Sequence, residues 1–282
     1  MKSVWKWIIA GTVILAIGLG VMITTLAVNG WAVDIEYEMQ TYTAKDDNSY
    51  LEIDLGASTL KTEFYDGDSI EIYYPQSKRL RTKIDEQQGK LTYKSEPKWY
   101  VNFSGTTKLP ETVIKMPKEK VLDLKIDLGA GTINLAGGVY GNVLIDVGAG
   151  KLNCQNIECN KLSFDISAGT VKLESIVCTT LVCDISAGTV KLESVECTNL
   201  VCDVSAGKLD ISSVACPDIK ADVSAGTVNL GISGIKSEYT ILSDVSAGTC
   251  NVSSQIGSTD KKLDVDCSAG TINVKFILDG TK

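Results

Sequence analysis

One feature of the sequence limits the possible folds more than any other: a short unit that returns with a period of 19. The segment DISAGTVKLES occupies residues 165–175 and is repeated unchanged at residues 184–194. Related Asp-x-(Ser/Gly)-Ala-Gly segments begin at Asp127, Asp146, Asp165, Asp184, Asp203, Asp222, Asp244 and Asp266. Successive starts differ by 19 five times and then by 22 twice, and a degenerate copy, DLGAS, begins at Asp54. A fixed period of this kind predicts stacked copies of one structural unit.

Apolar and polar residues alternate within each unit. The positions three before, one before and one after the Asp are apolar in most copies, as in Leu181, Cys183 and Ile185 around Asp184. This period of two predicts a strand with one buried face, from which the Asp points outward. Ala and Gly follow at the third and fourth positions after the Asp, and we expect a tight corner there, with the small Ala facing inward and the Gly supplying flexibility.

The repeat length separates the possible all-β folds. A propeller blade needs about 40 residues, and a leucine-rich repeat has an asparagine-containing consensus that is absent here. We therefore predict an all-β, single-stranded β-helix: a β-solenoid with 19-residue coils and about three short strands per coil. Each strand should pair with its copy in the next coil at about 4.8 Å, so that Leu181 and Leu200 are in contact. The two longer steps are interpreted as insertions at one corner.

The N-terminus is predicted to be a membrane anchor. Residues 8–28 contain no charged residue, and about 20 helical residues span a bilayer core. Lys2 and Lys6 precede this stretch and Asp34 follows it, which predicts a single-pass protein of the cell membrane with a cytoplasmic N-terminus and an extracytoplasmic C-terminal domain. A cleaved signal peptide is the alternative, although the apolar run exceeds the roughly 7–15 residues of a signal h-region.

Three segments follow from these patterns: a cytoplasmic tail and anchor (1–33), an irregular N-terminal part of the solenoid or cap (34–120), and the regular repeats (121–282). The interval from Asp54 to Asp127 is close to four times the repeat period, so the middle segment is interpreted as degenerate coils. Unpaired strand edges at solenoid ends need covering. We expect residues 96–110 and the tail FILDGTK (276–282) to be the caps.

The Asp column is the main candidate site. Like charges about 4.8 Å apart repel by roughly 1 kcal/mol in water, so something must offset the repulsion. The favoured interpretation is local: backbone N–H groups at the corner, and a neighbouring column of Asn and Lys, donate hydrogen bonds to the carboxylates. The alternative is a calcium ladder, because repeated Asp residues bind calcium in β-rolls. Its ligands would be Asp127, Asp146, Asp165, Asp184, Asp203, Asp222, Asp244 and Asp266.

Nine cysteines lie between Cys154 and Cys267, and they are interpreted mainly as small buried hydrophobic residues. Cys159, Cys178, Cys197 and Cys216 are spaced by the repeat period and should form one column, with Cys183 and Cys202 in a shorter one. Disulfides between stacked copies would be strained. A zinc site is disfavoured, because the chain has no His and no CxxC pair. No cofactor is predicted.

Composition excludes further classes of function. The absence of His removes the commonest general base, and a net charge of −8 argues against binding to nucleic acid.

The serial D-[IV]-S-A-G-T-[VI]-x-L units, preceded by VIKMPKEK and LDLKIDLGAGTINL, resemble the bacterial putative adhesin family of the DUF4097/DUF4098 type. That resemblance covers about residues 35–282 and implies a β-helical extracytoplasmic domain with a role in the cell envelope, without established catalytic residues.

We therefore predict a non-enzymatic, membrane-anchored protein: an adhesin or a structural or binding module of the cell envelope. Its expected partners are the membrane and either a cell-surface glycan or an envelope protein. One alternative is a regulatory or envelope-stress component that acts through a membrane protein partner. A remote alternative is a carbohydrate-active enzyme, which would need carboxylates clustered in a cleft.

Overall fold

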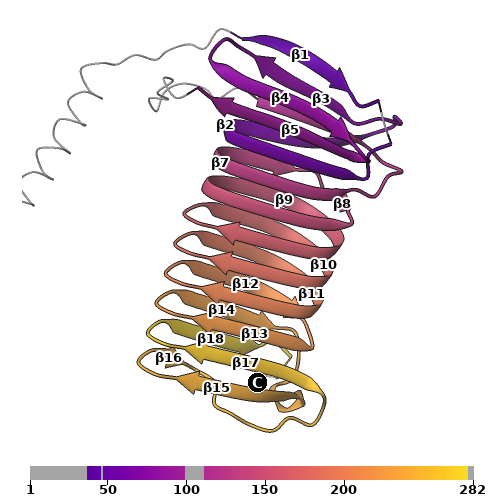
Figure 1. The fold of residues 1–282 in the computed structure, drawn as a ribbon. Coiled ribbons are helices and arrows are strands. Elements are labelled where there is room, and N and C mark those ends of the chain that lie inside the picture. Colours follow the sequence, from indigo (N-terminus) through magenta and orange to yellow (C-terminus); the bar gives the residue numbers. More distant parts are fainter. Residues whose placement is uncertain (1–36, 46, 99–110, 279–282) are drawn as a thin grey trace, which may run out of the picture. The chain divides into compact units, whose positions relative to one another are not determined.

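The computed structural model describes residues 37–45, 47–98 and 111–278, and these form an all-β body of stacked coils (Figure 1). The prediction of an all-β repeat fold is confirmed. The strands of the N-terminal part are β1 (Glu38–Thr43), β2 (Tyr50–Tyr65), β3 (Glu71–Gln76), β4 (Leu80–Gln87), β5 (Lys90–Pro97) and β6 (Glu111–Pro117). Those of the repeats are β7 (Asp123–Leu135), β8 (Gly138–Val139), β9 (Asn142–Ile166), β10 (Thr170–Ile185), β11 (Thr189–Val204), β12 (Lys208–Ala215), β13 (Asp218–Val223), β14 (Thr227–Ile232), β15 (Tyr239–Val245), β16 (Thr249–Cys250), β17 (Lys261–Cys267) and β18 (Thr271–Phe276).

Helical structure in this body is limited to the short 3-10 helix η1 (Lys236–Glu238). Across the ranges just given, no helix has the length and hydropathy needed to cross a bilayer. The predicted anchor, residues 8–28, lies outside the described residues, so the anchor stays a prediction.

The middle coils stack in the register that the repeat predicts. Strands β10 and β11 are parallel, with Leu181 opposite Leu200 and Asp184 opposite Asp203. Strands β9 and β10 pair with the same offset, which is the repeat period. Because one pattern serves every coil, the columns of inward side chains form one continuous core, in which Leu181 and Leu200 are almost completely buried.

The corner after each Asp differs from the prediction. In the coil of Asp184, Ala187 is exposed and Gly188 is buried, and the same arrangement recurs at Ala206 and Gly207. A Cβ on Gly188 would lie 2.6 Å from Cγ2 of Ile166 and 2.7 Å from the carbonyl oxygen of Gly169 in the preceding coil. The corner therefore needs Gly because a side chain has no room, and backbone flexibility is not the reason.

The N-terminal end has fewer degenerate coils than the interval suggests, and they stack out of sequence order. Strand β2 lies directly against β7, with Asp54 opposite Asp127, although β3, β4, β5 and β6 lie between these two strands in the sequence. Strands β5 and β6 pair with the opposite edge of β2, and β1, β3 and β4 extend this end in antiparallel directions. Strands β4 and β5 form a hairpin whose turn, Gln88 and Gly89, has positive φ at both residues.

The last two coils stack in reverse order. Strand β17 pairs with β13 on one side, with Asp266 opposite Asp222, and with β15 on the other, with Asp266 opposite Asp244. Strand β18 likewise lies between β14 and β16. Figure 1 shows β17 and β18 within the stack and β15 and β16 at its end. The expectation that every coil pairs with the next one in the sequence is wrong here.

The C-terminal cap is also different from the prediction. Phe276 is buried at the end of β18 and packs against Tyr239, with ring centroids 5.6 Å apart, so the described start of the tail lies within the stack. The loop of residues 251–260 covers the edge of β15 instead, and Ile241 and Gln255 exchange backbone hydrogen bonds of 2.9 and 3.0 Å. The other predicted cap, residues 96–110, is described only as far as residue 98.

Candidate functional site

The structure brings the predicted Asp residues together in one outward column. In spatial order the column is Asp54, Asp127, Asp146, Asp165, Asp184, Asp203, Asp222, Asp266 and Asp244. Lysines pair with two members: Lys94 lies 2.8 Å from Asp54 and Lys220 lies 3.0 Å from Asp222. Partial burial, together with the flanking carboxylates, raises the pKa of Asp146 and of Asp184. The repulsion that the sequence predicts is therefore present at these positions.

The predicted hydrogen-bond donors to this column have other partners. Asn153 donates to Asn134 at 3.1 Å and Asn273 donates to Asn229 at 2.8 Å, so the neighbouring polar column bonds to itself. The corner N–H groups bond to carbonyl oxygens of the preceding coil, as Ser186 does to Ile166 at 2.9 Å, so they do not serve the carboxylates as the favoured interpretation required.

The calcium hypothesis gains no support from the described part of the chain. Within residues 37–45, 47–98 and 111–278, no group of three or more metal-ligating side chains converges on one point. A column of Asp residues on successive strands supplies carboxylates in a line, whereas calcium takes six to eight oxygen ligands around one centre. The calcium ladder therefore stays a prediction.

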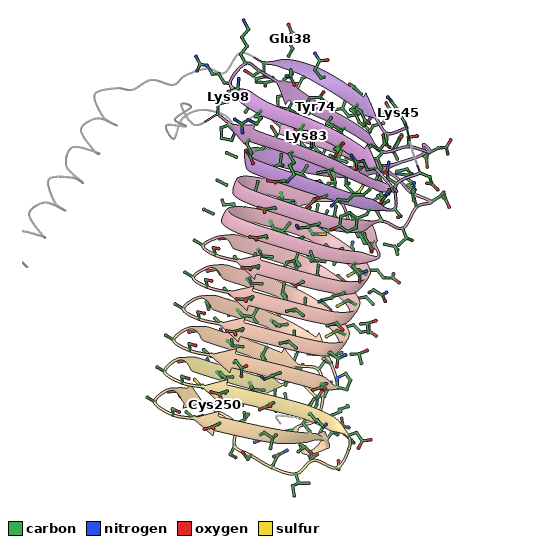
Figure 2. The ribbon with its side chains drawn as sticks, in the orientation of Figure 1. Glu38, Lys45, Tyr74, Lys83, Lys98 and Cys250 are labelled. Carbon is green, nitrogen blue, oxygen red and sulfur yellow. The ribbon has the colours of Figure 1, made fainter. Side chains whose placement is uncertain are left out.

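The cysteine columns form as the sequence predicts, with Cys178 opposite Cys197 and Cys183 opposite Cys202. All nine cysteines carry free thiols, and eight of them are buried. The hydrogen bond with Cys178, together with burial, raises the pKa of the Cys159 thiol, and burial raises the pKa of Cys154 to about 11. Buried, protonated thiols of this kind are poor nucleophiles. Only Cys250, near the C-terminal end in Figure 2, is partly exposed.

A groove interrupts the regular surface where β2, β7, β9 and β10 run side by side. We call it the Ala136 groove; its volume is about 400 Å³, and its lining includes Lys61, Asn134, Ala136, Asn153, Gln155 and Lys172. The groove forms because β7 ends at Leu135 and the chain then continues with the small residues Ala136 and Gly137. The next coil carries the longer side chains of Gln155 and Asn156 at these positions, so the hollow is bounded on that side.

Two hydrogen bonds hold the backbone at the groove. The N–H of Ala136 donates to Oγ1 of Thr62 at 2.8 Å, and the Tyr140 hydroxyl donates to the carbonyl oxygen of Ala136 at 2.7 Å. Tyr140 is itself buried and packs against Phe64, with ring centroids 5.5 Å apart. The groove is therefore a built feature of the surface, since both backbone groups of Ala136 are fixed by side chains of the core.

Strand register continues the groove across a longer line of outward side chains. Tyr73 of β3 lies opposite Val113 of β6, Val113 opposite Lys61 of β2, and Lys61 opposite Asn134 of β7. Asn134 then lies opposite Asn153, and Asn153 opposite Lys172. We call this line, Tyr73, Val113, Lys61, Asn134, Asn153 and Lys172, the Lys61 row. It crosses six strands, and at about 4.8 Å per strand it is roughly 24 Å long.

The charges along the row are largely neutralised on the protein itself. The Lys61 ammonium lies 2.5 Å from a carboxylate oxygen of Glu63, and Lys172 lies 3.5 Å from Glu174 and 3.6 Å from Glu193. The hydrogen bond from Lys61 lowers the pKa of Glu63, and both groups stay charged at neutral pH. At the other end, the Lys115 ammonium lies 4.7 Å from the centroid of the Tyr73 ring. The row therefore has an apolar end, an amide centre and paired charges.

The sequence predicts Asn134, Asn153 and Lys172 as part of one outward polar column, but it did not reveal the groove or the rest of the row. Tyr73, Val113 and Lys61 become neighbours only through the out-of-order pairing of β2, β3 and β6. One signal is present in the sequence: Ala136 and Gly137 replace a pair of longer polar residues, such as Gln155 and Asn156 in the next unit. A local loss of side-chain volume on a repeating surface indicates a hollow.

Comparisons with known proteins agree with this architecture. A model of the family described as Toastrack DUF4097 matches residues 48–275. The fold is similar to a crystal structure of a putative adhesin from Parabacteroides merdae, with a TM-score of 0.53, 16% identity and coverage of 85% of this chain and 96% of that one. A putative adhesin from Parabacteroides distasonis has a TM-score of 0.55, 14% identity and coverage of 85% and 98%. At these identities the likeness shows the fold alone. No curated protein matches the sequence.

Proposed function

Because the chain belongs to the Toastrack DUF4097 family, we propose that it is an extracytoplasmic binding module of the cell envelope, an adhesin held by a single membrane anchor and acting without catalysis. The solved structures of similar fold support an adhesin-like module, since two of them are described as putative adhesins. The predicted anchor at residues 8–28 supports attachment to the membrane.

One observation carries the binding role: the Ala136 groove is a fixed hollow on a surface that is otherwise repetitive. The following coils carry longer side chains at the position of Ala136, namely Gln155, Glu174 and Glu193. At the groove the small Ala136 lies beside the amides of Asn134 and Asn153, and core side chains hold its backbone in place. Binding sites are typically preformed concave regions with a few convergent polar groups.

Filling the groove tests the binding role. Full-length protein carrying Ala136→Trp should lose its capture of isolated envelope fragments, because the indole would occupy the space beside Asn134 and Asn153. The matched control is Ser212→Trp, which places the same side chain at an exposed site two coils beyond β10 on the same face. Equal capture by both variants would contradict the proposal, as would capture of nothing by the parent chain.

The location has a separate test that uses a native residue. Among the cysteines only Cys250 is partly exposed, so a membrane-impermeant maleimide added to intact cells should label the parent chain and not a Cys250→Ser variant. Labelling that requires lysis of the cells would contradict an extracytoplasmic domain.

A further inference from the structure

The Lys61 row combines features that identify the chemistry of a ligand. Its spacing comes from the strands, so equivalent positions recur about every 4.8 Å along a line that is perpendicular to them. That advance is comparable to the length of one sugar in an extended β-1,4-linked glycan. A polymer of this kind lying along the row would present one ring to each strand.

The centre of the row offers groups that suit hydroxyls. Asn153 donates to Oδ1 of Asn134 at 3.1 Å, which aligns the two amides on adjacent strands. An Asn side chain has two N–H donors and two acceptor lone pairs, so this single bond leaves donors on Asn134 and an acceptor on Asn153 for a ligand. Both side chains are exposed and both line the Ala136 groove.

The charge pattern favours an uncharged ligand. Lys61 and Lys172 each face a carboxylate on the protein, at 2.5 and 3.5 Å, so neither lysine brings an uncompensated positive charge. The chain as a whole carries a net charge of −8, which would repel an acidic polymer. An acidic polysaccharide therefore gains little at this site, whereas hydroxyl groups can bond to the amides at no electrostatic cost.

The composition of the groove argues against a folded protein as the ligand. Protein interfaces concentrate their binding energy in buried Trp, Tyr and Arg side chains. The groove lining contains none of these three residue types; it consists of Lys, Glu, Asn, Gln, Thr and small or aliphatic residues, with Cys154. The aromatic group on the row, Tyr73, lies at one end of it beside Val113. Because the Lys115 ammonium lies over one face of the Tyr73 ring, a sugar would contact the opposite face or the edge of the ring together with Val113.

We propose that the Lys61 row binds an extended, uncharged β-1,4-linked glycan, which lies across the coils with one sugar on each strand from Tyr73 to Lys172. This inference rests on the proposed binding function and names the class of its ligand. Asn134 and Asn153 bond to sugar hydroxyl or acetamido groups, and Tyr73 and Val113 contact the apolar face of a terminal ring. Because Lys61 and Lys172 are paired with carboxylates of the protein, they offer an acidic polymer little gain at the centre of the row.

Calorimetry with the full-length chain tests the proposal, with β-1,4-linked N-acetylglucosamine oligomers of two to six units, cellohexaose and an acidic oligogalacturonate as probes. Affinity for one of the neutral series should rise with length up to about six units, the number of strands in the row. The double variant Asn134→Ala/Asn153→Ala should lower it by about tenfold or more, the loss expected from two hydrogen bonds. The matched control Asn229→Ala/Asn273→Ala removes an equivalent amide pair, bonded at 2.8 Å, from the same face outside the groove, and it should bind as the parent does.

The proposal is overturned if no neutral oligomer binds, if both double variants bind equally, or if the acidic oligomer binds more tightly in low salt. In that case, capture of envelope fragments, measured in parallel, shows whether the ligand class alone is wrong or whether the proposed binding function is wrong as well. Capture that still depends on Ala136 would leave the binding function standing with a different ligand. Capture independent of Ala136 would refute the function as well.

Discussion

Replacing Gly188 by Ala should destabilise the solenoid, and the sign of the effect decides why the corner contains glycine. Gly188 does not have a positive φ; among the described glycines only Gly89 and Gly131 do. At a position with ordinary φ, Gly→Ala stabilises a protein by about 0.4–1 kcal/mol through the unfolded chain. If flexibility were the only role of Gly188, the variant would be equal to or more stable than the parent.

The structure predicts the opposite result. The new methyl group would lie 2.6 Å from Cγ2 of Ile166 and 2.7 Å from the carbonyl oxygen of Gly169. That carbonyl also accepts the N–H of Thr189 at 2.9 Å, so the coils cannot move apart without stretching a hydrogen bond. Overpacking of a core costs about 1–3 kcal/mol, and two contacts below 3.0 Å, one of them to backbone, put this variant at about 2–3 kcal/mol. After subtraction of an entropic gain of up to about 1 kcal/mol, we expect a net loss of about 1–2 kcal/mol. For a chain of this size the melting temperature should fall by about 2–8 °C.

Far-UV circular dichroism during heating and urea titration of the full-length chain measures the change. A useful control is Gly89→Asn, because Gly89 has φ of +77° but its nearest neighbour, Oγ of Ser49, would be 3.8 Å from a Cβ. Asn tolerates left-handed backbone, so this variant should change stability by less than about 1 kcal/mol. A Gly188→Ala variant that melts at or above the parent temperature refutes the steric explanation.

Three further predictions concern charge and thiol chemistry. Glu52 accepts from Lys90 at 2.7 Å and from Lys125 at 3.1 Å, and the bond from Lys90 is the main reason that its pKa falls from 4.5 to about 2. Glu52→Gln should therefore lower the free energy of unfolding at pH 7 by about 1–2 kcal/mol, after allowance for the partly exposed lysines. When stability is measured at decreasing pH, the difference between this variant and the parent should disappear between about pH 5 and pH 2. Asp184→Asn should raise the urea midpoint of unfolding at low ionic strength, because each neighbouring carboxylate repels the Asp184 carboxylate by roughly 1 kcal/mol in water. Salt at about 1 M should reduce this gain in stability. An unchanged midpoint would mean that other groups already neutralise the repulsion within the Asp column. The raised pKa of Asp184 points the same way, because its charged form is disfavoured in the folded state. The resulting loss of stability develops as the pH rises from the ordinary Asp pKa to the raised one and is complete above it. A thiol reagent should modify Cys250 much faster than Cys154, and equal rates in the native protein, read by mass spectrometry, would contradict the burial described above.

The sequence predicts the middle of the fold well, because local and long-range patterns coincide there. A fixed period and an inward Leu at the same position of successive units are sufficient to place Leu181 beside Leu200. The orientation of Ala187 and Gly188 could not be read in this way, since alternation breaks at a corner and both residues are small. Only the approach of the Gly169 carbonyl identifies the crowded position.

The order of the end coils was hidden for a different reason. Units that share the same columns are interchangeable partners, and the segments around Asp244 and Asp266 fit the coil of Asp222 almost equally well. Two signals become interpretable with the structure. Ser243 stands in an inward column that is apolar in the other units, and its N–H donates to Oγ of Ser254 in the loop that covers this edge. A polar residue in this column is compatible with a coil at the end of the stack. The longer repeat steps occur only where the chain passes over a coil and returns.

The repeat places Asn134, Asn153 and Lys172 in one column, but the rest of the row could not be predicted, because it depends on pairings that the repeat does not encode. Lys61 joins Asn134 through a contact between strands that are distant in the sequence, and Tyr73 joins Val113 through an antiparallel pair. Both pairings belong to the irregular N-terminal end. The repeat did place the Asp column from Asp127 to Asp222, whereas the order at its two ends and the partners of its carboxylates were not predicted.

The reversed coils at the C-terminal end and the displaced strand β2 at the other restrict how such a chain can lengthen during evolution. A unit duplicated at either tip would separate strands that hold each other out of sequence, as β17 is held between β13 and β15. A coil duplicated between Asp127 and Asp222 would pair only with coils of the same pattern, and the strand pairing at both ends of the stack would be unchanged. The two identical segments at residues 165–175 and 184–194 lie within that interval, where a recent copying event would be tolerated.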